Sequence, residues 1–144
     1  MADLSALTFQ IGGRSFAVDL ALVRAVLPAG HVTPVPGAPC EVRGLVNVRG
    51  MLAAVIDLGL LALGEPQEPR AGEAMVLLEA PAQPWSEGQP VRVAIRVERV
   101  LDVAPAAGGA VASLRIDMPM LLEQVRTALV RAAAAFGRAP ESTP

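Results

Sequence analysis

The 144-residue chain has no lysine and no tyrosine, one histidine and one cysteine, and aromatic residues make up only 3% of it. A single cysteine, Cys40, excludes an intramolecular disulfide and favours a reducing, cytoplasmic location. With His31 as the one histidine, the sequence offers too few ligands for a zinc site. We therefore predict that the protein holds no metal and no other cofactor.

Long runs of charge or of hydrophobicity are also missing. The 12 basic and 14 acidic residues nearly cancel, and the arginines are scattered, so no basic stripe for nucleic acid forms. No apolar run reaches the roughly 18 residues that a membrane-spanning helix needs. The first residues, Met1 to Leu4, lack the basic and apolar regions of a signal peptide. We expect a cytoplasmic protein that neither binds nucleic acid nor inserts into a membrane.

Apolar residues, glycine and proline are abundant instead. The hydrophobic fraction is 53%, the mean hydropathy is +0.47, and there are 13 glycines and 13 prolines. Alternating apolar residues bounded by glycine and proline predict short strands. The predicted strands are residues 7–11, 15–19, 44–48, 51–56, 74–79, 91–97 and 113–117. So many short strands favour barrels or a sandwich, in a mainly β fold.

Three segments have helical spacing. Residues 20–27 predict a short helix that ends before Pro28, and residues 58–63 predict a helical turn after Asp57. Residues 118–136 predict a terminal helix that Asp117 caps, with its apolar stripe packed on the barrel or partly exposed to a partner helix. Loops are expected at residues 28–39, 64–72, 81–90 and 104–112, with a flexible tail at 138–144.

A catalytic constellation is not evident. The candidates for nucleophile and base are Cys40 and His31, which lie near each other in a proline- and glycine-rich loop without a third orienting group. We predict no catalytic residues and no enzyme. An enzyme that uses Cys40 and His31 is a rival hypothesis, and it requires that Cys40→Ala abolish an activity.

Two surface features invite an interpretation. Asn47 and Arg49 are two residues apart, which predicts that they project to the same side of one strand. They serve either the chemistry of the following turn or, with the arginine beside an apolar patch, protein recognition. Trp85 lies in a loop, and we expect that this loop folds back and buries it.

Four stretches of the sequence resemble CheW domains. Residues 9–18 (FQIGGRSFAV) match the opening hairpin of that family, and residues 33–39 (TPVPGAP) match its proline-bearing lead-in. Residues 44–50 (GLVNVRG) carry its Asn-x-Arg-Gly turn, and residues 55–58 (VIDL) its closing Asp-Leu. We interpret the chain as a CheW-type coupling protein, a non-catalytic adaptor of a bacterial chemosensory system.

The resemblance implies a fold of two intertwined, SH3-like β-barrels. It predicts a single CheW-like domain over residues 4–137. The first barrel would span about 4–63, the second, reduced part about 73–117, and the terminal helix 118–136. Such a protein binds the cytoplasmic tip of a chemoreceptor, and a CheA-type histidine kinase or another CheW, in receptor clusters. A small-molecule-binding β-barrel with an apolar interior pocket is the alternative.

Position by position, the resemblance predicts a receptor-binding groove. Arg49 would be the groove arginine, and Asn47 and Gly50 would shape its turn. The apolar groove would be lined by Val23, Val26 and Val76.

Some positions depart from the family. Ala25 and Ala54 stand where the family often has Glu and Pro, and the segment between Val103 and Leu114 is too short for the family's further hairpin. The residues that would bind a kinase therefore stay unassigned. The hypothesis is that kinase binding is weakened or lost, as in accessory CheW-like proteins of the Frz type.

Overall fold

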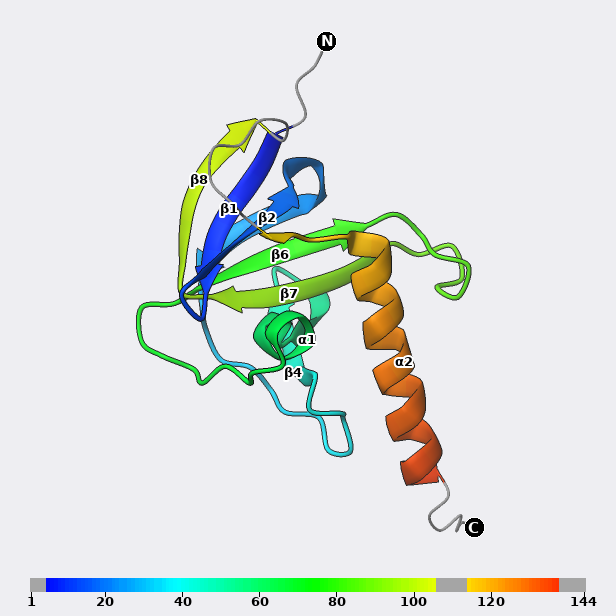
Figure 1. The fold of residues 1–144 in the computed structure, drawn as a ribbon. Coiled ribbons are helices and arrows are strands. Elements are labelled where there is room, and N and C mark those ends of the chain that lie inside the picture. Colours follow the sequence, from blue (N-terminus) through cyan, green and yellow to red (C-terminus); the bar gives the residue numbers. More distant parts are fainter. Residues whose placement is uncertain (1–4, 106–113, 138–144) are drawn as a thin grey trace.

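The computed structural model describes residues 5–105 and 114–137, and Figure 1 shows how their elements are arranged. The described fold begins with the β1–β2 hairpin. The strands are β1 (Ser5–Ile11), β2 (Arg14–Asp19), β3 (Val23–Pro28), β4 (Val42–Val48), β5 (Met51–Ile56), β6 (Ala74–Ala80), β7 (Val91–Val97), β8 (Arg99–Pro105) and β9 (Leu114–Arg115). The helices are a 3₁₀ turn, η1 (Leu20–Leu22), a short α1 (Leu58–Leu63) and a long α2 (Met118–Gly137). No described helix has both the length and the apolar composition to cross a membrane.

The larger sheet has five strands in the order β3-β6-β7-β5-β4, and it closes into a barrel. Closure is made by Thr33 and Leu45, whose N–H groups donate to each other's carbonyl oxygens at 2.9 and 2.8 Å. Gly44 lies beside this bridge with φ +151°, and a Cβ there would stand 2.2 Å from the Thr33 carbonyl oxygen. Only glycine lets the two backbones approach so closely.

Side chains from all five strands fill the barrel. The buried cluster holds Val48, Ala53, Val55, Met75, Leu77 and Ala94, with Ala25 and Leu27 packed against it. Arg92 and Arg96 flank Ala94 on β7 and form ion pairs with Glu79 (3.8 Å) and Glu73 (3.0 Å). The face of β7 that holds the arginines therefore faces the barrel interior.

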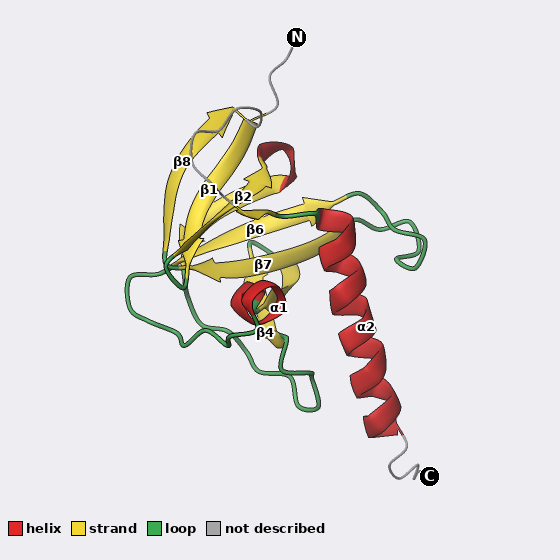
Figure 2. Ribbon diagram, viewed as in Figure 1, coloured by secondary structure: helices red, strands yellow, loops and turns green. Residues whose placement is uncertain are grey.

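The smaller sheet has four described strands in the order β8-β1-β2-β9. A second core lies between this sheet, the outer face of the barrel and α2. Figure 2 shows the arrangement of these elements. Its largest fully buried side chains include Phe9 and Phe16, whose rings stack with centroids 6.0 Å apart. From α2 it receives Met118, Leu121, Leu122 and Val125. The prediction of a mainly β protein with a reduced second sheet and a terminal helix is confirmed in its fold class.

The predicted helix at residues 20–27 is wrong beyond its first turn. Asp19 accepts a hydrogen bond from the Ala21 N–H at 3.3 Å and caps η1, but from Val23 the chain is the edge strand β3. Burial along β3 alternates residue by residue, with Ala25 and Leu27 directed into the barrel. Pairing with β6 thus decided between two conformations that the sequence pattern fits equally.

The predicted barrel boundaries, about 4–63 and 73–117, are also wrong. The small sheet takes β1 and β2 from the start of the chain and β8 and β9 from its later part. All strands of the large barrel lie between them in the sequence, over residues 23–97. One barrel is therefore inserted within the other, because β1 finds its partner in β8 across most of the chain.

Most other local predictions are confirmed. The two hairpins, the strands at β6, β7 and β9, and the helical turn α1 lie where they were expected. Asp117 caps α2 and accepts a hydrogen bond from the Met120 N–H at 3.2 Å. Trp85 is an exception, because its loop leaves it 39% exposed instead of burying it. The predicted tail at 138–144 and most of the predicted loop at 104–112 lie outside the described residues.

Candidate functional site

The tip of the β4–β5 hairpin holds three of the predicted groove residues. Val48 and Met51 close a two-residue turn in which Arg49 has φ +53° and Gly50 φ +85°. Positive φ at both positions is typical of a type I′ turn. The Oδ1 atom of Asn47 accepts a hydrogen bond from the Gly50 N–H at 2.8 Å. Asn47 therefore stabilises the turn, which was one of its two predicted roles. Arg49 lies in the predicted turn with Gly50, and the prediction that it shares a strand face with Asn47 is wrong.

The side chain of Arg49 is left available. It is exposed and takes part in no hydrogen bond or ion pair among the described residues. Leu52, which pairs with Asn47 across the hairpin, is 60% exposed, and Leu45 on the same hairpin is also exposed. The tip therefore presents one cation on a well-defined turn beside apolar side chains, an arrangement that suits protein recognition.

The other predicted groove residues lie on β3 and β6. Val26 pairs with Val76, so their side chains lie on the same face of the sheet. Val26 is 46% exposed at the sheet edge, whereas Val76 is 0% exposed and belongs to the core between the sheets. Val23 is half-buried against that core. Val76 cannot line an open groove here and instead supports Val26 from the next strand, which corrects its predicted role.

The structure thus sorts the predicted residues into two groups. Asn47, Arg49 and Gly50 form the hairpin tip, and Val23 and Val26 form part of the β3 edge. No hydrogen bond or ion pair among the described residues connects the groups directly. Both nonetheless belong to the same barrel, to whose interior Val48 and Leu27 contribute neighbouring side chains.

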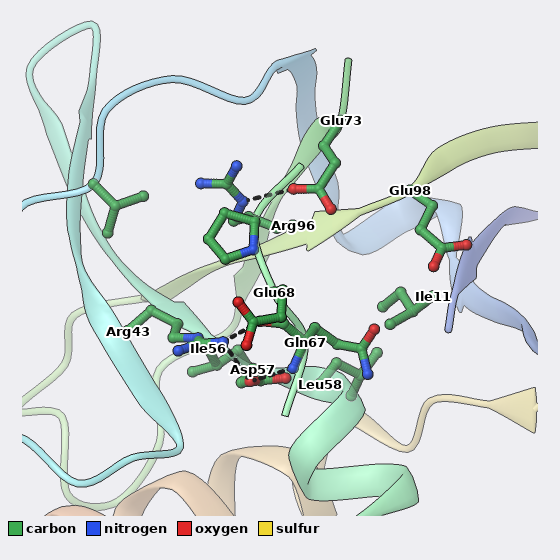
Figure 3. Close-up of a pocket in the computed structure, with 12 residues that line it drawn as sticks. Ile11, Arg43, Ile56, Asp57, Leu58, Gln67, Glu68, Glu73, Arg96 and Glu98 are labelled. Carbon is green, nitrogen blue, oxygen red and sulfur yellow. Dashed lines mark hydrogen bonds and ion pairs between the residues drawn. The ribbon is translucent and has the colours of Figure 1, made fainter. Parts of the chain in front are cut away.

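A polar pocket of about 190 Å³ lies elsewhere, around Asp57 (Figure 3). The side chain of Asp57 is 1% exposed and forms an ion pair with Arg43 at 3.2 Å. Its two oxygens also accept hydrogen bonds from the N–H groups of Leu60, at 3.0 Å, and Gln67, at 3.1 Å. The first bond caps α1, as predicted, and the second holds the loop after α1.

The sequence did not identify Arg43 and Gln67 as members of this cluster. Arg43 donates to the Gln67 carbonyl oxygen in addition to its ion pair with Asp57. Gly59 allows the loop to lie close, because a Cβ there would stand 2.4 Å from the Gln67 side chain. The local signal was an Asp after an apolar strand, which reveals a cap but not a loop contact ten residues away.

The polar groups of this pocket hold the fold together. On its other side Arg96 is paired with Glu73 at 3.0 Å, and Glu98 accepts from the Gly12 N–H at 2.8 Å. The four charges of Arg43, Asp57, Arg96 and Glu73 form two ion pairs, and Glu98 binds the backbone of the β1–β2 turn. The barrel interior, where the small-molecule alternative placed its ligand, is filled by side chains such as Met75 and Leu77, both 0% exposed. No observation favours that alternative.

The structure does not bring together Cys40 and His31, the catalytic pair of the rival hypothesis. Cys40 is exposed, and its Sγ lies 3.9 Å from an oxygen of Glu41, while no hydrogen bond of the described residues joins it to His31. Within the described ranges, no group of three His, Cys, Asp or Glu side chains is placed to hold a metal ion. The pKa of Glu41 is lowered by a hydrogen bond from its own backbone and by the nearby Arg131. The ion pair between Arg131 and Glu41 joins α2 to the loop before β4.

Comparison with known proteins assigns the fold to a family. The profile of the CheW-like domain matches residues 5–107, most of the chain. The chain belongs to the CheW-like domain family. The scaffolding protein TtCheW from Thermoanaerobacter tengcongensis has a similar fold, with a TM-score of 0.61 and 18% identity, over 76% of this chain and 66% of that one.

Similar sequences have names from chemotaxis. The probable chemotaxis protein CheW of Rhizobium etli is 27% identical over 77 residues, which cover 54% of this chain and 50% of the relative. Protein PilI of Pseudomonas aeruginosa is 39% identical over 54 residues, 38% of this chain and 30% of the relative. The chain matches only about half of the length of the Rhizobium relatives. The family thus groups this chain with scaffold and coupling proteins of chemotaxis.

Proposed function

We propose that this CheW-like chain is a non-catalytic adaptor that binds the cytoplasmic tip of chemoreceptors and helps to organise receptor–CheA kinase arrays. The observation that carries the proposal is Arg49, an exposed cation without a partner among the described residues, on a defined turn of a CheW-like domain. We place the protein in the cytoplasm, at chemoreceptor clusters.

Arg49 suits the recognition of a helical receptor tip. A guanidinium binds carboxylates in a fixed, bidentate geometry, so one arginine can set the register of a partner helix. Apolar side chains supply contact area, and Leu52 on the same hairpin and Val26 on the separate β3 edge are 60% and 46% exposed. Asn47 and Gly50 contribute by holding the turn that carries Arg49.

The proposal is tested with Arg49→Glu and a purified receptor cytoplasmic fragment. We expect binding to weaken at least tenfold, because a salt-bridged interface arginine typically contributes more than about 1.4 kcal/mol. The measurement is isothermal titration or a surface binding assay.

Arg14→Glu is the matched control. Arg14 is also exposed beside a hairpin turn and has no partner among the described residues. The control has the same charge change, so it should bind like the wild type. Equal binding by the wild type and Arg49→Glu would remove Arg49 from the receptor site.

The kinase contact is the second half of the proposal. We infer that this chain binds a CheA-type kinase, or another CheW, less tightly than relatives with a complete second barrel. The small sheet has four described strands, one of them with two residues, and β8 and β9 are its two edges. A surface that depends on the missing strands would be lost with them.

A further inference from the structure

The outer edge of β8 has no partner strand in the described part of the chain. β8 is an outermost strand of the small sheet and pairs only with β1. Figure 1 shows it as the yellow-green arrow at the margin of the molecule. An unpaired edge presents N–H and C=O groups that can pair with a strand of another chain.

Apolar side chains accompany this free edge. Leu101 is 41% exposed and Val103 49% exposed. Val103 lies opposite the buried Leu7, so its side chain is on the core face of the sheet. Val100, opposite Phe9, packs partly against that core. The core is therefore incompletely covered where the sheet ends at β8.

We propose that two copies of this chain associate through β8, with the two strands antiparallel across a two-fold axis. Such an axis, perpendicular to the sheet, keeps the core faces on the same side. Val103 of each copy then extends the apolar face of the other, and the two small sheets become one continuous sheet. The bulge at Leu101 and Pro105 at the strand end limit the pairing to a short segment, so the dimer is weak.

The charges of β8 favour a second copy of this chain as the partner at this edge. With the axis between Val100 and Leu101, Arg99 of one copy lies opposite Asp102 of the other, and this pair occurs twice. Arg99 Nε donates to Gln10 Oε1 at 3.1 Å, which leaves its terminal amino groups available. One oxygen of Asp102 accepts from the Val103 N–H at 2.7 Å, and the other has no partner among the described residues. Opposite charges in facing positions stabilise a strand pair, and like charges destabilise it.

Sedimentation velocity over a concentration series tests the dimer. We expect the wild type to shift from monomer to dimer as its concentration rises. Arg99→Asp and Asp102→Arg each create two like-charge pairs and should raise the midpoint concentration about tenfold or more. The double variant Arg99→Asp/Asp102→Arg restores opposite charges and should return the midpoint close to that of the wild type.

A control variant separates β8 from the other exposed apolar surface. Met120→Glu changes a side chain of α2 that is also exposed, and it should leave the midpoint unchanged. A wild type that stays monomeric at millimolar concentration would overturn the proposal. So would single variants that dimerise like the wild type, or a Met120→Glu variant that alone prevents dimerisation. The proposal does not depend on receptor binding, since neither Arg49 nor the β3 edge takes part.

Discussion

Gly44 is the residue on which closure of the large barrel most directly depends. In Gly44→Ala the new methyl group would stand 2.2 Å from the Thr33 carbonyl oxygen, so the Thr33–Leu45 bridge must open. We expect this variant to lose at least about 3 kcal/mol of unfolding free energy, from backbone strain and steric overlap together. Urea denaturation followed by circular dichroism measures the loss.

Gly13→Ala isolates the backbone part of that effect. Gly13 also has a positive φ, +76°, but nothing lies within 4 Å of a Cβ built there. This control should lose only about 1–2 kcal/mol, the cost of a left-handed conformation for alanine. Equal losses in the two variants would mean that contact with Thr33 does not constrain Gly44.

Asp57 is the one buried charged residue in the described part of the chain. In Asp57→Ala the α1 cap, the hydrogen bond to the Gln67 N–H and the ion pair with Arg43 disappear together. We expect a loss of about 2–3 kcal/mol, because a helix cap contributes about 1 kcal/mol and a buried partner is removed as well. Denaturant titration measures it.

Asp117→Ala is the matched variant for the cap alone. Asp117 caps α2 at the surface and has no basic partner among the described residues. Its loss should be about 1 kcal/mol. If Asp57→Ala cost no more than Asp117→Ala, the contacts to Arg43 and Gln67 would add nothing to stability.

Single residues could be predicted from the sequence where their partners are near in the chain. Asp57 and Asp117 were identified as caps because a cap and its helix are adjacent. The turn role of Asn47 was one of two interpretations for the same reason. Arg43 and Gln67 were missed, since they meet Asp57 only when a loop folds back. The turn at Arg49 and Gly50 was predicted, but the prediction that Arg49 projects to the same side of the strand as Asn47 was wrong, because Arg49 is a turn residue with a positive φ.

Among the elements, β3 shows where a sequence pattern is ambiguous. Leu20, Val23 and Leu27 are spaced as on a helix, and Val23, Ala25 and Leu27 alternate as on a strand. In the structure the three residues of η1 are helical, and the rest of the segment forms the strand β3. β6 provides a partner along the whole of β3, and that pairing is not visible in a local window.

The attachment of α2 to the large barrel should depend on pH through Glu41. A lowered pKa in the folded state means that ionised Glu41 adds stability above the ordinary pKa of glutamate, and that this stability is lost as the pH falls through the folded-state pKa. Glu41→Gln should therefore be less stable than the wild type at pH 7, by less than about 1 kcal/mol because Arg131 is largely exposed. The two proteins should converge in acid, as thermal unfolding at several pH values would show.

Glu123→Gln serves as the control for this experiment. Glu123 pairs with Arg126 within α2 at 3.2 Å, so this pair does not join the helix to another element. We expect a smaller difference from the wild type at pH 7 than for Glu41→Gln. A Glu41→Gln deficit that persisted unchanged at the lowest pH would mean that ionisation of Glu41 does not stabilise the attachment.

At the scale of the whole molecule, the proposed function predicts that receptor binding and kinase binding are separable, because the small sheet has only four described strands. We expect a pull-down with a receptor fragment to retain the protein, and a pull-down with the regulatory domain of a CheA-type kinase to retain less of it. The chemotaxis protein CheW of Thermotoga maritima, 25% identical over 103 residues, is a suitable comparison. Stoichiometric kinase binding by this chain would contradict the inferred weakening.

The layout of the whole chain could be predicted only in part. The fold class and the terminal helix followed from composition, periodicity and the resemblance to CheW domains. The boundaries of the two barrels did not, because β1 pairs with β8 and β5 with β7 across long stretches of sequence. Such pairings leave no local trace in the residues that form them.

The insertion of one barrel within the other has a consequence for protein synthesis. The β1–β2 hairpin leaves the ribosome before the large barrel, but its partner β8 is made only after every strand of that barrel. At a typical rate of about 5–20 residues per second, the hairpin waits several seconds with its apolar face uncovered. Among the described strands, those made earliest are thus among the last to be paired, and their apolar face stays exposed for most of the synthesis of the described residues.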